Sequence, residues 1–260
     1  MKIFLHPSMN KAIVTGCTSE LAEAYVTAFG TAGYPVTGIA RGAHASGNHE
    51  HVRLDLSDSR AATRFVRGLN LSGIESLVLV HGVGSFVFEE HPGPMDVESY
   101  TSNYLTFMHL AEPLRYRVMH ETRAHLTLVS FGSTGDRYDV PYWQTYSRCN
   151  RMRKEKMRDW AIQSPGRISG VFVALPTVDT QCQRAMRPYA DRTYWRAPQE
   201  VAERTLPAIL SVPHWAELAP FNPLSEGVID AYFSNHPRIY AKWMREMGRS
   251  DGSVGANPNL

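Results

Sequence analysis

Lys11-Ala12-Ile13-Val14-Thr15-Gly16-Cys17-Thr18-Ser19-Glu20-Leu21-Ala22 is the stretch that decides the fold. A short apolar, β-branched run ends at Gly16, and a helical pattern follows. A glycine directly after a strand allows a sharp turn, and the free N–H groups at the start of the next helix can bind a pyrophosphate. Glu20 and Ala22 stand where many nucleotide-binding folds have their second and third glycines, so the glycine pattern alone is a weak match.

Strand-like runs alternate with helical patterns along the rest of the chain, which predicts a Rossmann-like, doubly wound parallel sheet of six to seven strands with helices on both faces. We expect a single domain over residues 1–260, with a ligand at the carboxyl ends of the strands. A seventh strand is not visible, and a disordered tail is expected at 249–260. The expected strands are 11–15, 35–40, 51–56, 76–80, 125–129 and 170–175, and the expected helices are 21–31, 59–69, 97–119, 142–163 and 198–210, with two more near 230–233 and 237–244.

The composition favours a globular protein without a nucleic-acid partner. With 27 Lys and Arg against 25 Asp and Glu, the formal charge is only +2, and the basic run 151–158 is interpreted as the solvated face of a helix. No stretch reaches the ~18 apolar residues of a membrane span. The three cysteines, Cys17, Cys149 and Cys182, are odd in number and lack metal-ligand spacing, so we expect a cytoplasmic protein without a metal site.

Several motifs between residues 11 and 180 resemble those of the short-chain dehydrogenase/reductase family. Thr15-Gly16 with Thr18, Ser19 and Leu21 matches the family's first turn, in the less common variant that carries an acidic residue, here Glu20, and an alanine. The resemblance implies a Rossmann fold, a nicotinamide cofactor and an oxidoreductase that acts on a small molecule. It also implies a homodimer or homotetramer.

The resemblance assigns the adenosine end of the cofactor to two places. Arg41 ends the second strand where NADP-preferring members carry an arginine for the 2′-phosphate, so NADP(H) is favoured over NAD(H). The alternative for Arg41 is an exposed loop residue. Asp55, followed by Leu56, matches the adenine contact, but Asp55 could instead cap the next helix.

Further matches complete the predicted cofactor site. Pro176-Thr177-Val178-Asp179-Thr180 resembles the family turn beside the nicotinamide amide. Val80-His81-Gly82-Val83-Gly84 stands in for the family's Asn-Asn-Ala-Gly turn at the end of the fourth strand, which assigns His81 and Gly82 to the cofactor site. His81 is expected to be structural rather than catalytic, since a lone histidine there more often bonds the backbone. Asn103 matches the asparagine that holds a proton-relay water.

The catalytic segment matches the family only in part. Tyr146 matches the family's proton donor, but Asn150 stands four residues later in place of the lysine that binds the ribose and lowers the tyrosine pKa. Asparagine can bond ribose hydroxyls but brings no charge, and an unassisted tyrosine titrates near ~10. Ser133 is preferred over Ser130 as the residue that polarises the carbonyl. A buried aromatic on a helix face is the structural alternative for Tyr146.

Residues 181–197 form a polar and aromatic connection where the family places its substrate lid. Three functions remain open. The first is an NADP(H)-dependent oxidoreductase of the ketoreductase or alcohol dehydrogenase type. The second is an enzyme on the same fold without net hydride transfer, such as a cyclase, dehydratase or isomerase. The third is a non-catalytic nucleotide-binding regulator.

Overall fold

Seven parallel strands form one sheet in the order β3-β2-β1-β4-β5-β6-β7 in the computed structural model, which describes residues 9–43, 49–90, 93–221 and 226–249. The chain winds outward from β1 to β3 on one side and from β4 to β7 on the other, so the order reverses between β1 and β4. The predicted doubly wound sheet is confirmed. The strands are β1 Met9–Thr15, β2 Val36–Ala40, β3 Glu50–Arg53, β4 Ile74–His81, β5 His125–Ser133, β6 Ile168–Leu175 and β7 Trp215–Leu218.

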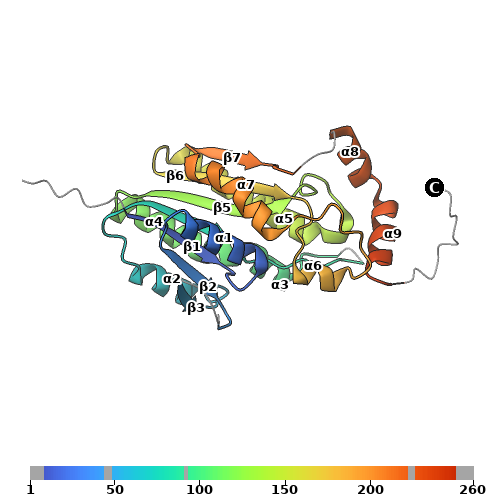
Figure 1. Ribbon diagram of the computed structural model, residues 1–260, viewed down its shortest axis with the longest axis horizontal. Coiled ribbons are helices and arrows are strands. Elements are labelled where there is room, and N and C mark those ends of the chain that lie inside the picture. Colours follow the sequence, from blue (N-terminus) through green and yellow to red (C-terminus); the bar gives the residue numbers. More distant parts are fainter. Residues whose placement is uncertain (1–8, 44–48, 91–92, 222–225, 250–260) are drawn as a thin grey trace, which may run out of the picture.

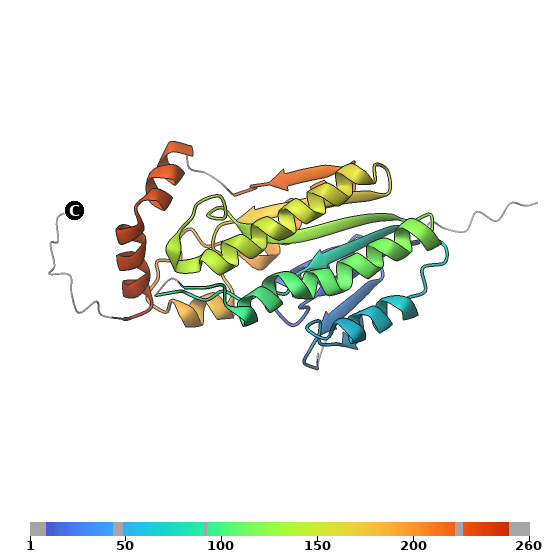
Figure 2. The same cartoon turned by 180° about the vertical axis from the view of Figure 1, so that it is seen from behind.

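Helices cover both faces of the sheet. α1 and α7 pack together on one face, while α2, α4 and α5 cover the other (Figures 1 and 2). At the end towards which the strands point lie α6, α8 and α9 (Figure 1). The helices are α1 Glu20–Thr31, α2 Ser59–Gly68, α3 Val97–Tyr100, α4 Thr106–Glu121, α5 Gln144–Gln163, α6 Gln181–Met186, α7 Pro198–Ser211, α8 Glu226–Ser234 and α9 His236–Glu246.

The continuous apolar character of the strands follows from this layering. On β1, Ala12 and Val14 belong to the core cluster under α1 and α7, whereas Ile13 belongs to the cluster under α2 and α4. Successive residues of a strand point to opposite faces, so a strand covered on both sides must be apolar at every position. All three side chains have no exposed surface.

The seventh strand of the sheet is Trp215–Leu218, a four-residue edge strand with no fully buried position, so its sequence lacks the apolar run that would make it visible. Two local predictions were wrong. The third strand ends at Arg53 instead of residue 56. The single helix expected over 97–119 is divided by a π-helix at Thr101–Leu105.

Residues 181–197 begin with α6, which the sequence did not predict. Among the described residues no helix is both long and apolar enough to cross a membrane. The predicted tail at 249–260 lies outside the described residues except for Arg249.

Candidate active site

Two cavities open at the carboxyl ends of the strands, one on each side of the start of α1. The first cavity has a volume of about 650 Å³, and the second about 320 Å³. Gly16, Thr18 and Ser19 line the first, and Leu21 lines the second. A long ligand that occupied both would therefore cross the N-terminus of α1.

The turn between β1 and α1 brings backbone close to this crossing point. Gly16 has φ +69°, and a Cβ there would lie 2.9 Å from the carbonyl oxygen of Gly82. A Cβ on Gly82 would lie 2.7 Å from the carbonyl oxygen of Thr15. Ser19 caps α1 by accepting from the backbone N–H of Ala22. Glycine is thus required at both positions, and the helix end has the form that binds phosphate.

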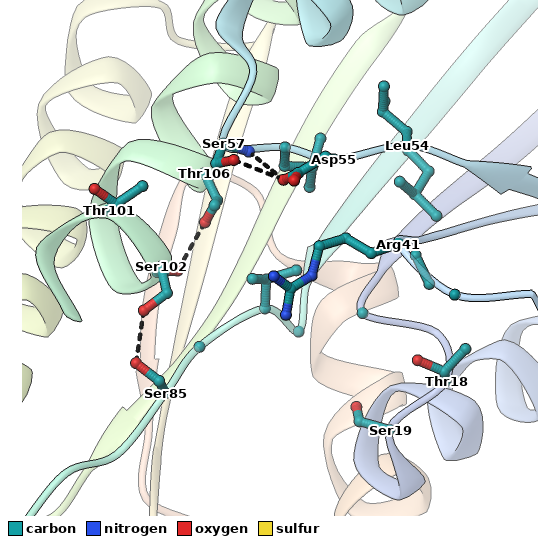
Figure 3. A pocket seen from close by; sticks show the side chains of 18 of the residues that line it. Thr18, Ser19, Arg41, Leu54, Asp55, Ser57, Ser85, Thr101, Ser102 and Thr106 are labelled. Atoms are coloured by element: carbon teal, nitrogen blue, oxygen red, sulfur yellow. Dashed lines mark hydrogen bonds between the residues drawn. The ribbon is translucent and has the colours of Figure 1, made fainter. Parts of the chain in front are cut away.

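The first cavity brings Arg41 and Asp55 together (Figure 3). Asp55 accepts from the N–H and hydroxyl of Ser57 at 2.9 and 2.8 Å, and these bonds, with a smaller contribution from Arg41, lower the pKa of the Asp55 carboxyl. Asp58, rather than Asp55, caps α2. The guanidinium of Arg41 projects into the cavity and has no ion-pair partner within the described ranges. Leu56 and Gly82 complete the predicted residues on its wall.

Glu20, which stands in the second-glycine position, lines neither cavity. Its carboxylate accepts from Arg184 Nη2 at 2.7 Å and from the backbone N–H of Gln181 at the start of α6. Arg184 also donates to Asp179 Oδ1 at 3.0 Å. The carboxylate is therefore neutralised close to where a pyrophosphate would lie, and it holds α6 against α1.

The second cavity contains the predicted catalytic pair. Ser133 and Tyr146 both line it, as do Thr177, Val178 and Thr180. Ser130 is fully buried and lines neither cavity. Aromatic side chains form much of the remaining wall: Phe86, Phe131, Trp143, Tyr232, Phe233 and Trp243.

Tyr146 is held as a neutral phenol. Burial, and then the charge of Asp136, raises its pKa to about 12, while a hydrogen bond from Asn150 and the charge of Arg153 act in the opposite direction. A phenol with this pKa keeps its proton at neutral pH and can donate it.

Behind Tyr146 lies a buried polar network. Asn150 Nδ2 donates to Asp136 Oδ1 at 3.2 Å, and Arg153 Nη2 donates to Asn150 Oδ1 at 2.7 Å. Arg153 also donates to the carbonyl oxygens of Asn103, at 2.6 Å, and Phe131, at 2.5 Å. Burial raises the pKa of Asp136 to about 6, although Ser133 N–H, Asn150 and Arg153 all stabilise its charged form. Asn150 therefore directs both ends of its amide into the protein.

Arg153 is the residue that the sequence did not identify. The basic run 151–158 was predicted to be solvated, and for Arg153 this is wrong, since it is only 3% exposed. The available signal was its spacing: Tyr146, Asn150 and Arg153 follow one another by four and three residues, which places them on one helix face. The guanidinium bonds the side chain of Asn150, so a positive charge lies beside the position at which the family has its lysine.

Asn103 and His81 take structural positions. The side chain of Asn103 bonds the backbone N–H and carbonyl of Ser85 at 3.0 and 2.8 Å, and its own backbone carbonyl accepts from Arg153 Nη1 at 2.6 Å. His81 lies between Thr15 and Thr106 and is 1% exposed. Burial, and then the charge of Arg153, holds its pKa well below the usual value.

Comparison with known proteins identifies the fold of the chain and nothing further. No protein-family model matches the chain, and no curated protein matches it. An aldohexose dehydrogenase from Thermoplasma acidophilum superposes with a TM-score of 0.64 at 13% identity, covering 84% of this chain and 98% of that one. The chain has the short-chain dehydrogenase/reductase fold.

Two further structures with this fold were determined with cofactors. A short-chain dehydrogenase from Burkholderia cenocepacia in complex with NADP has a TM-score of 0.66 at 14% identity, covering 91% of this chain and 98% of that one. A 4-hydroxyisoleucine dehydrogenase complexed with NADH has a TM-score of 0.67 at 14% identity, covering 80% and 96%. These superpositions confirm the predicted fold. Because the identities are so low, the activity has to be argued from the site residues.

Proposed function

We propose that the protein is an NADP(H)-dependent oxidoreductase that reduces a carbonyl group to a secondary alcohol. The observation that carries the proposal is the pair of cavities on either side of the α1 N-terminus, with Ser133 and Tyr146 in the second. The NADP complex of the Burkholderia cenocepacia protein supports a nicotinamide cofactor on this fold.

The residues present fit such a cofactor. Asp55 and Leu56 would hold the adenine, and Arg41 would pair with a 2′-phosphate, because its guanidinium faces the cavity and has no competing carboxylate bond within the described part of the chain. The start of α1 would hold the pyrophosphate. Thr177 and Thr180 would hold the nicotinamide amide in the second cavity, where the bound cofactor would supply a hydride.

The chain's own groups would supply the rest of the chemistry. Ser133 would donate a hydrogen bond to the substrate carbonyl oxygen, and Tyr146 would transfer its phenolic proton to that oxygen as the carbonyl carbon accepts hydride. The pKa of about 12 favours this direction, since alcohol oxidation needs a tyrosinate base. The aromatic walls favour a substrate with an apolar or aromatic body.

Asn150 is proposed as a positioning residue instead of the ribose clamp expected from the sequence. It is fully buried and lines neither cavity. Its amide bonds Asp136 and Arg153, the two charged groups that act on the pKa of Tyr146, so it holds those charges in place beside the tyrosine.

One observation favours an enzyme without net hydride transfer. Arg153 donates two of its hydrogen bonds to backbone carbonyls and does not line the second cavity, so it does not reach a bound ribose as the family's lysine would. A cyclase, dehydratase or isomerase would need Tyr146 and Ser133 but no reduced cofactor. A non-catalytic nucleotide-binding regulator would need neither.

The test combines cofactor binding and turnover. Calorimetric titration should show that NADPH binds more tightly than NADH, and a screen of aryl and alkyl ketones should find one that drives NADPH oxidation. Tyr146→Phe should abolish this oxidation, whereas Tyr142→Phe, a neighbouring tyrosine outside both cavities, should retain it. Full activity in Tyr146→Phe would refute the assignment. Conversion of substrate without NADPH oxidation would establish the non-redox alternative. Failure to bind either NADPH or NADH would reject the proposed nicotinamide cofactor site.

A further inference from the structure

A cluster of one thiol and two imidazoles lies beside the first cavity. Cys17 follows Gly16 in the turn after β1, His49 precedes β3, and His51 lies within β3. Their potential ligand atoms all lie within 4.8 Å of one another, and Cys17 Sγ is 3.6 Å from His51 Nδ1. Cys17 is buried, and both histidines are partly buried.

Gly38 makes room for this cluster. It lies on β2 opposite His51 of β3. A Cβ at this position would lie 2.7 Å from His49 Nε2 and 3.0 Å from Cys17 Sγ. Any larger residue would therefore occupy the space into which the thiol and the His49 ring project.

The orientation of His51 is that of a metal ligand. Its Nε2 lies 3.0 Å from the carbonyl oxygen of Gly42. A carbonyl oxygen only accepts, so Nε2 carries the proton and Nδ1 presents its lone pair towards Cys17. Histidine ligands in metal sites commonly donate their second ring N–H to a backbone carbonyl in this way, which fixes the tautomer and the ring.

We propose that Cys17, His49 and His51 bind a zinc-type transition-metal ion. A thiolate with two imidazoles is a donor set that Zn²⁺ prefers, whereas Mg²⁺ and Ca²⁺ prefer oxygen ligands. The Cys17 thiol loses its proton as the S–metal bond forms, so each ion bound releases one proton. Three protein ligands leave a fourth tetrahedral position for water or another donor.

The site would connect metal binding to the cofactor turn. Gly16 and Thr18, the neighbours of Cys17, line the first cavity, and so does Gly42, whose carbonyl orients His51. A bound ion would tie the turn after β1 to the edge strand β3. The cysteine count gave no indication of this, because the ligands come from separate segments; the His-x-His spacing of residues 49 and 51 was the only local signal.

The test uses the full-length protein, stripped of metal by a chelator and titrated with CoCl₂. Wild type should bind one Co²⁺ and develop the near-ultraviolet sulfur-to-cobalt charge-transfer band with the intense visible bands of tetrahedral Co²⁺. Cys17→Ser should lose the charge-transfer band, and His51→Gln should weaken binding by at least about tenfold. Cys182→Ser, which removes the exposed cysteine outside the cluster, should behave like wild type.

Gly38→Ala keeps all three ligands and serves as the second variant, with folding checked by circular dichroism. It should weaken Co²⁺ binding, because the new methyl group fills the space of the His49 ring. Absence of a charge-transfer band in wild type would overturn the proposal. A band that persists in Cys17→Ser, or that disappears in Cys182→Ser, would overturn it as well.

Discussion

Replacement of Arg153 by methionine tests the buried network directly. Methionine fills a similar volume but leaves the carbonyl oxygens of Asn103 and Phe131 and the amide oxygen of Asn150 without their donor. It also removes the positive charge that opposes the raised pKa of Asp136. Removing one of two interacting buried charges costs about 3–5 kcal/mol, because the other charge is left uncompensated. We expect a loss of this size in the free energy of unfolding at about pH 8, which corresponds to a decrease of ~6–20 °C in Tm.

The loss should depend on pH. Asp136 has a pKa of about 6, so at about pH 5 it is mostly protonated in the folded protein and needs no counter-charge. Only the loss of the Arg153 hydrogen bonds then remains, so the loss of stability should be smaller than at about pH 8. The Asp136→Asn background should likewise reduce the effect of Arg153→Met at about pH 8, because the charge that Arg153 balances is gone.

The assay is urea unfolding followed by tryptophan fluorescence and circular dichroism at both pH values. Arg158→Met, an exposed arginine on the same helix, is the matched control and should change stability by no more than about 0.5 kcal/mol. A loss below about 1 kcal/mol for Arg153→Met, or an equal loss at both pH values, would refute the charge network inferred here.

Three further predictions concern the cofactor cavity, the contact between α1 and α6, and the buried histidine. Arg41→Ala should weaken NADPH binding at least about tenfold and leave NADH nearly unchanged in calorimetry, with the exposed Arg60→Ala as control; equal losses for both cofactors would contradict the 2′-phosphate role. Glu20→Gln removes the charge that holds Arg184 and should accelerate tryptic cleavage within 181–197 while changing overall stability by less than about 1 kcal/mol; an unchanged cleavage rate would show that the contact does not hold α6. His81 has a folded pKa well below its unfolded value near ~6.5, so its stabilisation is present above that pH and is lost as the pH falls below it. His81→Gln should therefore flatten the acid side of the stability profile in urea unfolding, and an unaltered profile would reject a buried neutral imidazole.

The sequence by itself determined the first strand, the Gly16 turn, the alternating topology and the positions of Ser133, Tyr146, Arg41 and Asp55 on cavity walls. These features depend on local rules. A strand covered on both faces must be continuously apolar, a turn with positive φ favours glycine, and residues that end parallel strands meet at one edge of the sheet. The roles of these residues, the cytoplasmic location and the oligomeric state stay predictions.

Only the tertiary structure decided the inward orientation of Arg153, the pairing of Glu20 with Arg184 and the grouping of Cys17 with His49 and His51. Glu20 and Arg184 are 164 residues apart. Arg153, which donates to Asn150, belongs to the basic run 151–158, whose sequence resembles a solvated helix face. Charge patterns cannot show which side of a helix is buried when a basic side chain finds its partners among carbonyl oxygens of other elements. Those oxygens carry no sequence signature, because every residue has one.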